Sequence, residues 1–195
     1  MSVDLRALRR DIRSRRAALT PAFRIAAAQQ LAARLSSLAS MPASGYVAGY
    51  WAVDGEIPLL SWQTSLGSDR IYCLPVLGDD DRLRFAPWRS GDALVSNRFG
   101  IPEPDVEPTS LLDASALAAI VMPLVAFDAN GNRIGMGGGW YDRTLAGVRD
   151  RQPRPLLIGA AYELQRVDAI APAAWDVPLD AVCTESSVYL ASTAE

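Results

Sequence analysis

The 195-residue sequence contains no histidine, and all 19 of its basic residues are arginine, so lysine is absent as well. Without histidine, a Ser-His-Asp triad and a histidine-ligated zinc site are excluded. Without lysine, a Schiff base and the lysine of the usual phosphate-binding loop are excluded. Any catalysis must therefore use carboxylates, arginines, tyrosines, backbone N–H groups or a magnesium ion held by carboxylates.

Long apolar runs and closely spaced cysteines are also missing. Nothing approaches the run of about 18 apolar residues that predicts a membrane span, and the arginine-rich start lacks the apolar core of a secretory signal. Cys73 and Cys183 lie in apolar runs, which favours buried free thiols in a reducing cytoplasm over a disulfide or metal site. The net charge of −3 argues against general nucleic-acid binding. We therefore expect a cytoplasmic protein with neither membrane nor nucleic acid among its partners.

Half of the residues are apolar, which suits a single domain over residues 1–195 with a sizeable core. Hydrophobic periodicity and turn signals predict helices over 4–18, 21–39, 56–66 and 140–149, and strands over 45–51, 70–77, 83–88, 116–127, 155–162 and 180–184. Strand, helix and strand within about 30 residues is typical of a parallel sheet. The predicted fold class is α/β, with a central, mostly parallel sheet flanked by helices. Residues 90–113 are interrupted by prolines and are expected to form an irregular loop around a site.

The first predicted helix has an apolar stripe of Leu5, Leu8 and Ile12 and a second face of arginines. This basic face is formed by Arg6, Arg9 or Arg10, Arg13 and Arg16. It is either a solvated surface or a clamp on phosphates, and the sequence leaves both open. Thr20 followed by Pro21 predicts the start of the second helix, as an N-cap with proline in the first helical position.

The stretch NRIGMGGGWYDRTL, residues 132–145, places four glycines between a predicted strand and a predicted helix. Glycines let backbone N–H groups converge on an anion such as a phosphate. Arg133 and Arg143 flank the loop, and Asp142 is a hard oxygen ligand suited to Mg²⁺. The alternative is a turn that only allows the helix to pack closely on the sheet.

Two further acidic positions are candidates. Glu56 lies in a strand-to-helix connection, where α/β sheets place ligands, and Tyr50 and Trp51 beside it could stack on a flat ring. Glu56 could instead be a first-turn acid that is stabilised by the helix dipole. In APAAWDVPLD, Asp176 and Asp180 could cap turns, or one of them could be a second metal ligand.

The stretch VMPLVAFDANGNRIGMGGGWYDRTL resembles the signature of the 5-formyltetrahydrofolate cyclo-ligases, also called 5,10-methenyltetrahydrofolate synthetases. Three further segments follow the order of that family: LRALRRDIRSRRAALTP, FGIPEP (99–104) and IGAAYELQRVDAIAPAAWDVPLDAVCTE (158–185). The resemblance implies a single α/β domain that acts on small molecules. The implied reaction closes 5-formyltetrahydrofolate to the 5,10-methenyl form with ATP and Mg²⁺, and releases ADP and phosphate. We expect a monomer or weak dimer.

The resemblance also assigns roles to residues. It implies that ATP binds two segments, namely Leu5, Arg6, Ala7, Leu8 and Arg9, and then Arg133, Ile134, Gly135, Met136, Gly137, Gly138, Gly139, Trp140 and Tyr141. It implies Mg²⁺ at Asp142 and Asp176 and folate at Trp51 and Glu56. From the reaction we expect Arg133 and Arg143 to stabilise phosphoryl charge.

Three positions depart from the family pattern. Leu5 stands where a lysine is common, Trp175 where many relatives carry histidine, and Trp140 where tyrosine or phenylalanine is usual. Two other interpretations of the sequence therefore stay open: a non-catalytic relative that binds nucleotide or folate, and a related ATP-dependent enzyme with a different substrate.

Overall fold

The computed structural model describes residues 4–148 and 151–191. Its helices are α1 (Leu5–Ala17), α2 (Pro21–Ser37), α3 (Leu60–Ser65) and α4 (Trp140–Ala146). The strands of the main sheet are β1 (Gly45–Ala48), β2 (Arg70–Leu77), β3 (Leu83–Pro87), β6 (Leu117–Pro123), β9 (Leu156–Ala160), β10 (Ala181–Cys183) and β11 (Val188–Leu190). Two small hairpins pair β4 (Leu94–Ser96) with β5 (Pro102–Pro104) and β7 (Ala126–Phe127) with β8 (Arg133–Ile134).

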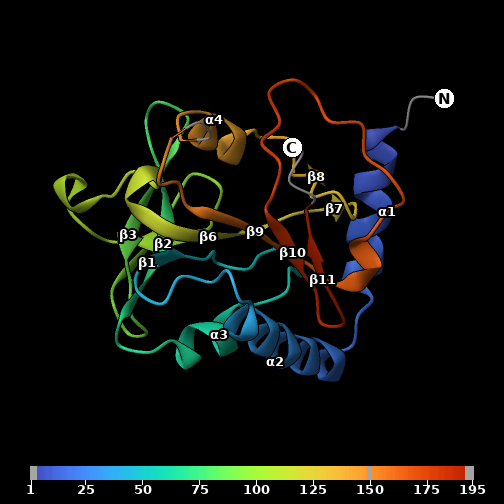
Figure 1. The fold of residues 1–195 in the computed structure, drawn as a ribbon, viewed down its shortest axis with the longest axis horizontal. Coiled ribbons are helices and arrows are strands. Elements are labelled where there is room, and N and C mark those ends of the chain that lie inside the picture. Colours follow the sequence, from blue (N-terminus) through green and yellow to red (C-terminus); the bar gives the residue numbers. More distant parts are fainter. Residues whose placement is uncertain (1–3, 149–150, 192–195) are drawn as a thin grey trace.

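The main sheet has seven strands in the order β11-β10-β9-β6-β1-β2-β3, and it lies between helices in Figure 1. The five inner strands are parallel to one another. The edge strands β3 and β11 are antiparallel to their neighbours. The predicted α/β class with a mostly parallel central sheet is confirmed. None of the described helices is long and apolar enough to cross a membrane.

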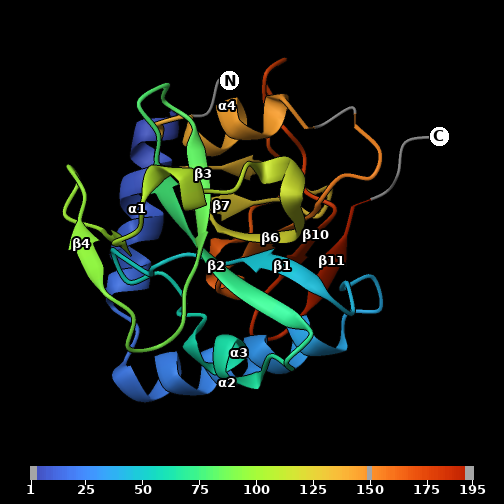
Figure 2. The same ribbon diagram turned by 90° about the vertical axis from the view of Figure 1, so that its left-hand side faces the viewer.

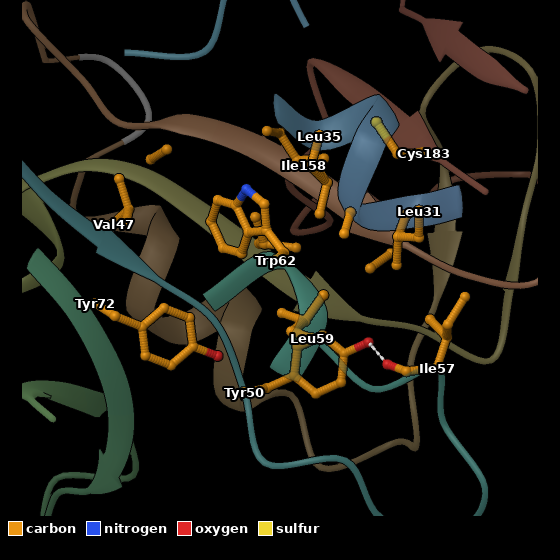
Figure 3. Packing of buried hydrophobic residues seen from close by; sticks show 14 of the residues in the cluster. Leu31, Leu35, Val47, Tyr50, Ile57, Leu59, Trp62, Tyr72, Ile158 and Cys183 are labelled. Atoms are coloured by element: carbon orange, nitrogen blue, oxygen red, sulfur yellow. Dashed lines mark hydrogen bonds between the residues drawn. The ribbon is translucent and has the colours of Figure 1, made fainter. Parts of the chain in front are cut away.

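The helices cover both faces of the sheet and one side. Helices α2 and α3 lie below the sheet in Figure 1, where Leu31, Leu35 and Trp62 pack against Val47 and Ile158, as Figure 3 shows from close by. Helix α4 lies above the sheet, with Leu145 in the second core cluster. Helix α1 lies at the side, beside the β7–β8 hairpin. Both faces of the central strands are therefore buried, as a parallel sheet requires.

Local sequence signals account for the starts of the first two helices. The Asp4 side chain accepts hydrogen bonds from the N–H groups of Arg6 and Ala7, and Thr20 caps α2 at the N–H of Phe23, with Pro21 in the first turn. The predicted basic face of α1 is wrong at one position, because Arg16 is only 1% exposed.

Several predicted boundaries need correction. The strand expected over 116–127 ends at Pro123, which has no N–H to donate; the chain then leaves the sheet, and β7 pairs with β8 instead. The helix expected over 56–66 begins only at Leu60, because Asp54 and Gly55 form a turn with positive φ and residues 56–59 have no regular secondary structure. The loop expected over 90–113 contains the β4–β5 hairpin, and β11 was not predicted. Helix α4 ends at Ala146, and residue 149 of its expected range lies outside the described residues.

Candidate active site

A cavity of about 530 Å³ opens beyond the carboxyl ends of β1, β2 and β6. This is the edge at which parallel α/β sheets bind ligands. Its walls come from the residues that follow β1, from the glycine loop before α4, from the start of α1, from the β4–β5 hairpin and from the 170–176 segment. Figure 2 shows that α4 and the β4–β5 hairpin belong to separate parts of the chain. The cavity therefore assembles groups that are distant in sequence.

Most of the predicted site residues line this one cavity. They are Leu5, Arg9, Trp51, Glu56, Asp176 and the continuous run from Arg133 to Asp142. Four predicted residues, Arg6, Ala7, Leu8 and Arg143, are not part of its lining. Trp175, which departs from the histidine of many relatives, also lines the cavity and is 74% exposed.

The glycine loop contains backbone conformations that favour glycine, as its sequence suggested. Gly137 and Gly139 adopt φ values of +98° and +68°, which side chains other than glycine rarely tolerate. A Cβ at Gly139 would lie 2.7 Å from Nη1 of Arg143. From α1, Nε of Arg9 donates a hydrogen bond of 2.8 Å to the carbonyl of Gly135. Arg9 is thus the N-terminal arginine that reaches the loop.

The two arginines that flank the loop are both already engaged. Arg133 is buried, with its side chain 6% exposed; its Nη2 donates to Oδ1 of Asp142 at 2.5 Å, and its Nη1 donates to the carbonyl of Val177. Arg143 lies beside Gly139, where Nε donates to the Asp81 carbonyl and the guanidinium lies 5.4 Å from the Trp140 ring centroid. Arg133 therefore orients Asp142, while Arg143 braces the start of α4.

Glu56 lines the cavity, and its pKa is shifted by its surroundings. It is 8% exposed, and its Oε2 accepts a 3.0 Å hydrogen bond from the N–H of Val53. Burial raises the pKa of Glu56 from 4.5 to about 7, against the lowering effects of that hydrogen bond and of Arg16. The alternative of a first-turn helix acid is wrong, because α3 begins four residues later.

Aromatic rings surround Glu56. The Tyr50 hydroxyl donates to the carbonyl of Ile57 at 2.6 Å, a bond drawn in Figure 3. Trp51 packs edge-on against Trp88, with centroids 5.9 Å apart. Burial raises the pKa of Tyr141, so its phenol stays protonated. The pocket around the carboxylate thus offers flat apolar surfaces with fixed polar groups.

The carboxylates in the cavity fit a magnesium ion that is shared with a ligand. Asp142 and Asp176 both line it, and Oδ2 of Asp176 also accepts from the Ala173 N–H at 2.8 Å. Asp180 instead forms an ion pair with Arg154, so its role is structural. Within residues 4–148 and 151–191, no group of three or more His, Cys, Asp or Glu residues could hold a metal. Mg²⁺ is often bound by only one or two carboxylates together with substrate phosphates, so these two residues suit it.

The sequence placed residues 90–113 around a site, and the structure confirms this, but the sequence did not reveal the β4–β5 hairpin within them. Glu103 is buried there, and its Oε1 accepts from the N–H of Leu77 at 2.9 Å and from Nδ2 of Asn97 at 2.8 Å. At the hairpin tip, the Phe99 ring lies edge-on to Trp140, with centroids 6.3 Å apart. The FGIPEP motif marked this segment, but nothing in its local pattern indicated which residue faces the cavity.

Comparisons with known proteins show the family and the fold of the chain. The profile of the 5-formyltetrahydrofolate cyclo-ligase family matches residues 1–185. The 5-formyltetrahydrofolate cyclo-ligase of Escherichia coli K12 is 38% identical over 183 residues, which cover 91% of this chain and 98% of that protein. The enzyme of the same name from Haemophilus influenzae is 36% identical, with 88% and 92% covered. Among solved structures, Aquifex aeolicus 5,10-methenyltetrahydrofolate synthetase superposes with a TM-score of 0.83 at 27% identity, over 99% of this chain and 95% of that one.

Proposed function

The chain belongs to the 5-formyltetrahydrofolate cyclo-ligase family, and from this premise we propose that it closes 5-formyltetrahydrofolate to 5,10-methenyltetrahydrofolate. ATP is the co-substrate, and ADP and phosphate are released. The observation that carries the proposal is that one cavity contains both the glycine loop and the buried Glu56 with its aromatic neighbours. A phosphate-binding surface and a surface for a flat heterocycle therefore face the same space.

The reaction needs an enzyme that positions its substrates more than one that supplies reactive side chains. The formyl oxygen is a poor leaving group until it attacks the γ-phosphorus of ATP, which forms a P–O bond and releases ADP. N10 of the folate then attacks the activated formyl carbon and loses its proton, and phosphate departs with the formyl oxygen. The substrate itself supplies both nucleophiles, so the absence of histidine and lysine is no obstacle.

In the proposed nucleotide site, the backbone N–H groups of residues 135–139 face the phosphates, and Arg9 fixes the loop through the Gly135 carbonyl. Asp142 and Asp176 would hold Mg²⁺, which neutralises charge on the phosphates when bound. Arg133 keeps Asp142 oriented and adds positive charge near the transferred group. The contact of Arg143 with Trp140 supports a role in holding α4.

In the proposed folate site, Glu56 accepts hydrogen bonds from the amine and amide N–H groups of the pterin, and Trp51 lies against the ring. An ionised carboxylate is a stronger acceptor for two parallel donors than a neutral one. Since Cys73 and Cys183 are buried free thiols, we also propose that the protein acts in the cytoplasm. A monomer or weak dimer stays our prediction for its oligomeric state.

The deciding experiment mixes the protein with MgATP and 5-formyltetrahydrofolate and follows the absorbance of the methenyl product together with ADP. We expect the two products to form in equal amounts. Binding of both ligands without turnover would indicate a non-catalytic relative. ADP release that depends on another formylated compound, with no methenyl product, would indicate a related enzyme.

A further inference from the structure

A turn that begins at Val53 and ends at Glu56 is held in place by arginines from the first two helices. Nε of Arg16 donates to the carbonyl of Asp54 at 3.0 Å, and Nη2 of Arg13 pairs with Oδ2 of Asp54 at 2.9 Å. From α2, Arg24 lies so close that a Cβ at Gly55 would be 2.9 Å from its Nη1. The turn has positive φ at Asp54 and Gly55, so it needs such support from outside.

Of these arginines, Arg16 is the buried one. Its Nη1 lies 3.5 Å from the carbonyl of Leu124, a residue of the cavity lining, and its Nη2 has no hydrogen-bond partner among the described residues. A buried guanidinium requires a compensating negative charge. Asp54 is largely exposed and bound to Arg13, whereas Glu56 is buried. Glu56 is the buried carboxylate that acts on Arg16, since its charge raises the pKa of the guanidinium against the lowering effect of burial.

We propose that Arg16 is a positioning residue for the folate site, which fixes the turn that presents Glu56 and whose positive charge favours the carboxylate that accepts the pterin N–H groups. This inference rests on the proposed function, because it assigns Glu56 to the folate. It concerns a residue that does not itself touch the substrate. Arg16 acts from behind the turn, through charge and through the Asp54 carbonyl.

The charges around Glu56 determine what the loss of Arg16 does. Arg16 faces it from α1, Asp54 from its own turn, Tyr50 from the chain after β1, and Tyr141 from α4. Burial raises the pKa of Glu56, Arg16 and the Val53 N–H lower it, and Asp54 raises it. Both phenols are neutral at physiological pH, since burial raises their pKa values. Among the described residues, Arg16 is thus the cationic side chain that lowers the pKa of Glu56.

The test compares Arg16→Gln, Arg16→Lys and the matched control Arg15→Gln, which removes an exposed arginine of α1 that pairs with Asp11 and does not touch the turn. The Glu56 carboxyl is titrated by ¹³C NMR in the ligand-free protein, with its signal assigned by Glu56→Gln. In Arg16→Gln we expect the midpoint to rise by about one pH unit and, because the ionised fraction of Glu56 at pH 7 falls accordingly, the KM for 5-formyltetrahydrofolate to rise about fivefold. The KM for ATP should stay within about twofold, because no phosphate contact is lost. Both values for Arg16→Lys should lie between those of the parent and Arg16→Gln, and Arg15→Gln should resemble the parent.

An unchanged Glu56 midpoint in a folded Arg16→Gln protein would overturn the proposal and leave Arg16 with a structural role only. Where Arg16→Gln does not fold, Arg16→Lys carries the test: a Glu56 midpoint and a KM for the folate that both lie above the parental values support the proposal, and a parental value of either one overturns it. The NMR titration needs no turnover, so its outcome is separate from failure of the proposed reaction, which shows as no methenyl product from the parent protein.

Discussion

Arg133 and Asp142 form an ion pair that joins the strand before the glycine loop to the helix after it, with 2.5 Å between Nη2 and Oδ1. The same guanidinium donates through Nη1 to the carbonyl of Val177, next to Asp176. One cation thus holds the carboxylate of Asp142 and the backbone of the residue that follows Asp176. A carboxylate held in this way has little orientational freedom left to lose when a metal binds.

Replacement of Asp142 by asparagine tests its role at the metal. The amide keeps the shape but removes the charge that Mg²⁺ requires, so we expect kcat to fall at least about 100-fold. The Kd for 5-formyltetrahydrofolate, measured by calorimetry, should change by less than about twofold because no folate contact is lost. Asp113→Asn is the matched control, since Asp113 is an exposed carboxylate paired with Arg84. Unchanged turnover in Asp142→Asn would refute the metal role.

Replacement of Arg9 by glutamine tests the link from α1 to the glycine loop. Arg9 donates to the Gly135 carbonyl and lines the cavity, so its loss frees the loop and removes a positive charge from the phosphate site. We expect the KM for ATP to rise about tenfold, with the KM for the folate unchanged. Arg10→Gln, one residue along on an exposed position, should have the parental KM for ATP. Equal effects of both substitutions would mean that only the overall charge of α1 matters.

Features with a local cause could be predicted from the sequence. Asp4 and Thr20 cap helices through hydrogen bonds to residues two or three positions away, and Gly137 and Gly139 allow a loop that their own backbone requires. The apolar run that contains β6 identified the centre of the sheet. These signals place the glycine loop and Glu56 at ligand-binding positions without any knowledge of the fold.

Features with a distant cause could not be predicted. The burial of Arg16 depends on Asp54 and Leu124, which lie 38 and 108 positions away. The burial of Glu103 depends on the N–H of Leu77, which the proline-rich sequence around it does not indicate. In the same way, the engagement of Arg133 by Val177 appears only when the segments meet. Charged residues of this kind look solvated in the sequence and become partners only in the folded chain.

The raised pKa of Glu56 predicts a pH-dependent stability. A group whose pKa is higher in the folded than in the unfolded chain stabilises the protein fully below its unfolded value, here 4.5, and loses that contribution as the pH rises through about 7. We therefore expect Glu56→Gln to be more stable than the parent at pH 8 by roughly 2 kcal/mol, and the difference to shrink toward pH 5. Urea unfolding at both pH values measures it. A difference independent of pH would show that Glu56 titrates normally.

Replacement of Glu103 by alanine tests how the β4–β5 hairpin is attached to the cavity wall. Oε1 of Glu103 accepts from the Leu77 N–H at the end of β2 and from Asn97 within the hairpin, so its loss leaves a backbone donor without its partner. We expect the free energy of unfolding to fall by about 1–3 kcal/mol. Because Phe99 and Ile101 of the same hairpin line the cavity, the KM for the folate should also rise. Glu107→Ala, at an exposed position four residues along, is the matched control and should change neither quantity. A large loss of stability with a parental KM would separate the hairpin from substrate binding, since the wall would then move without effect on the ligand.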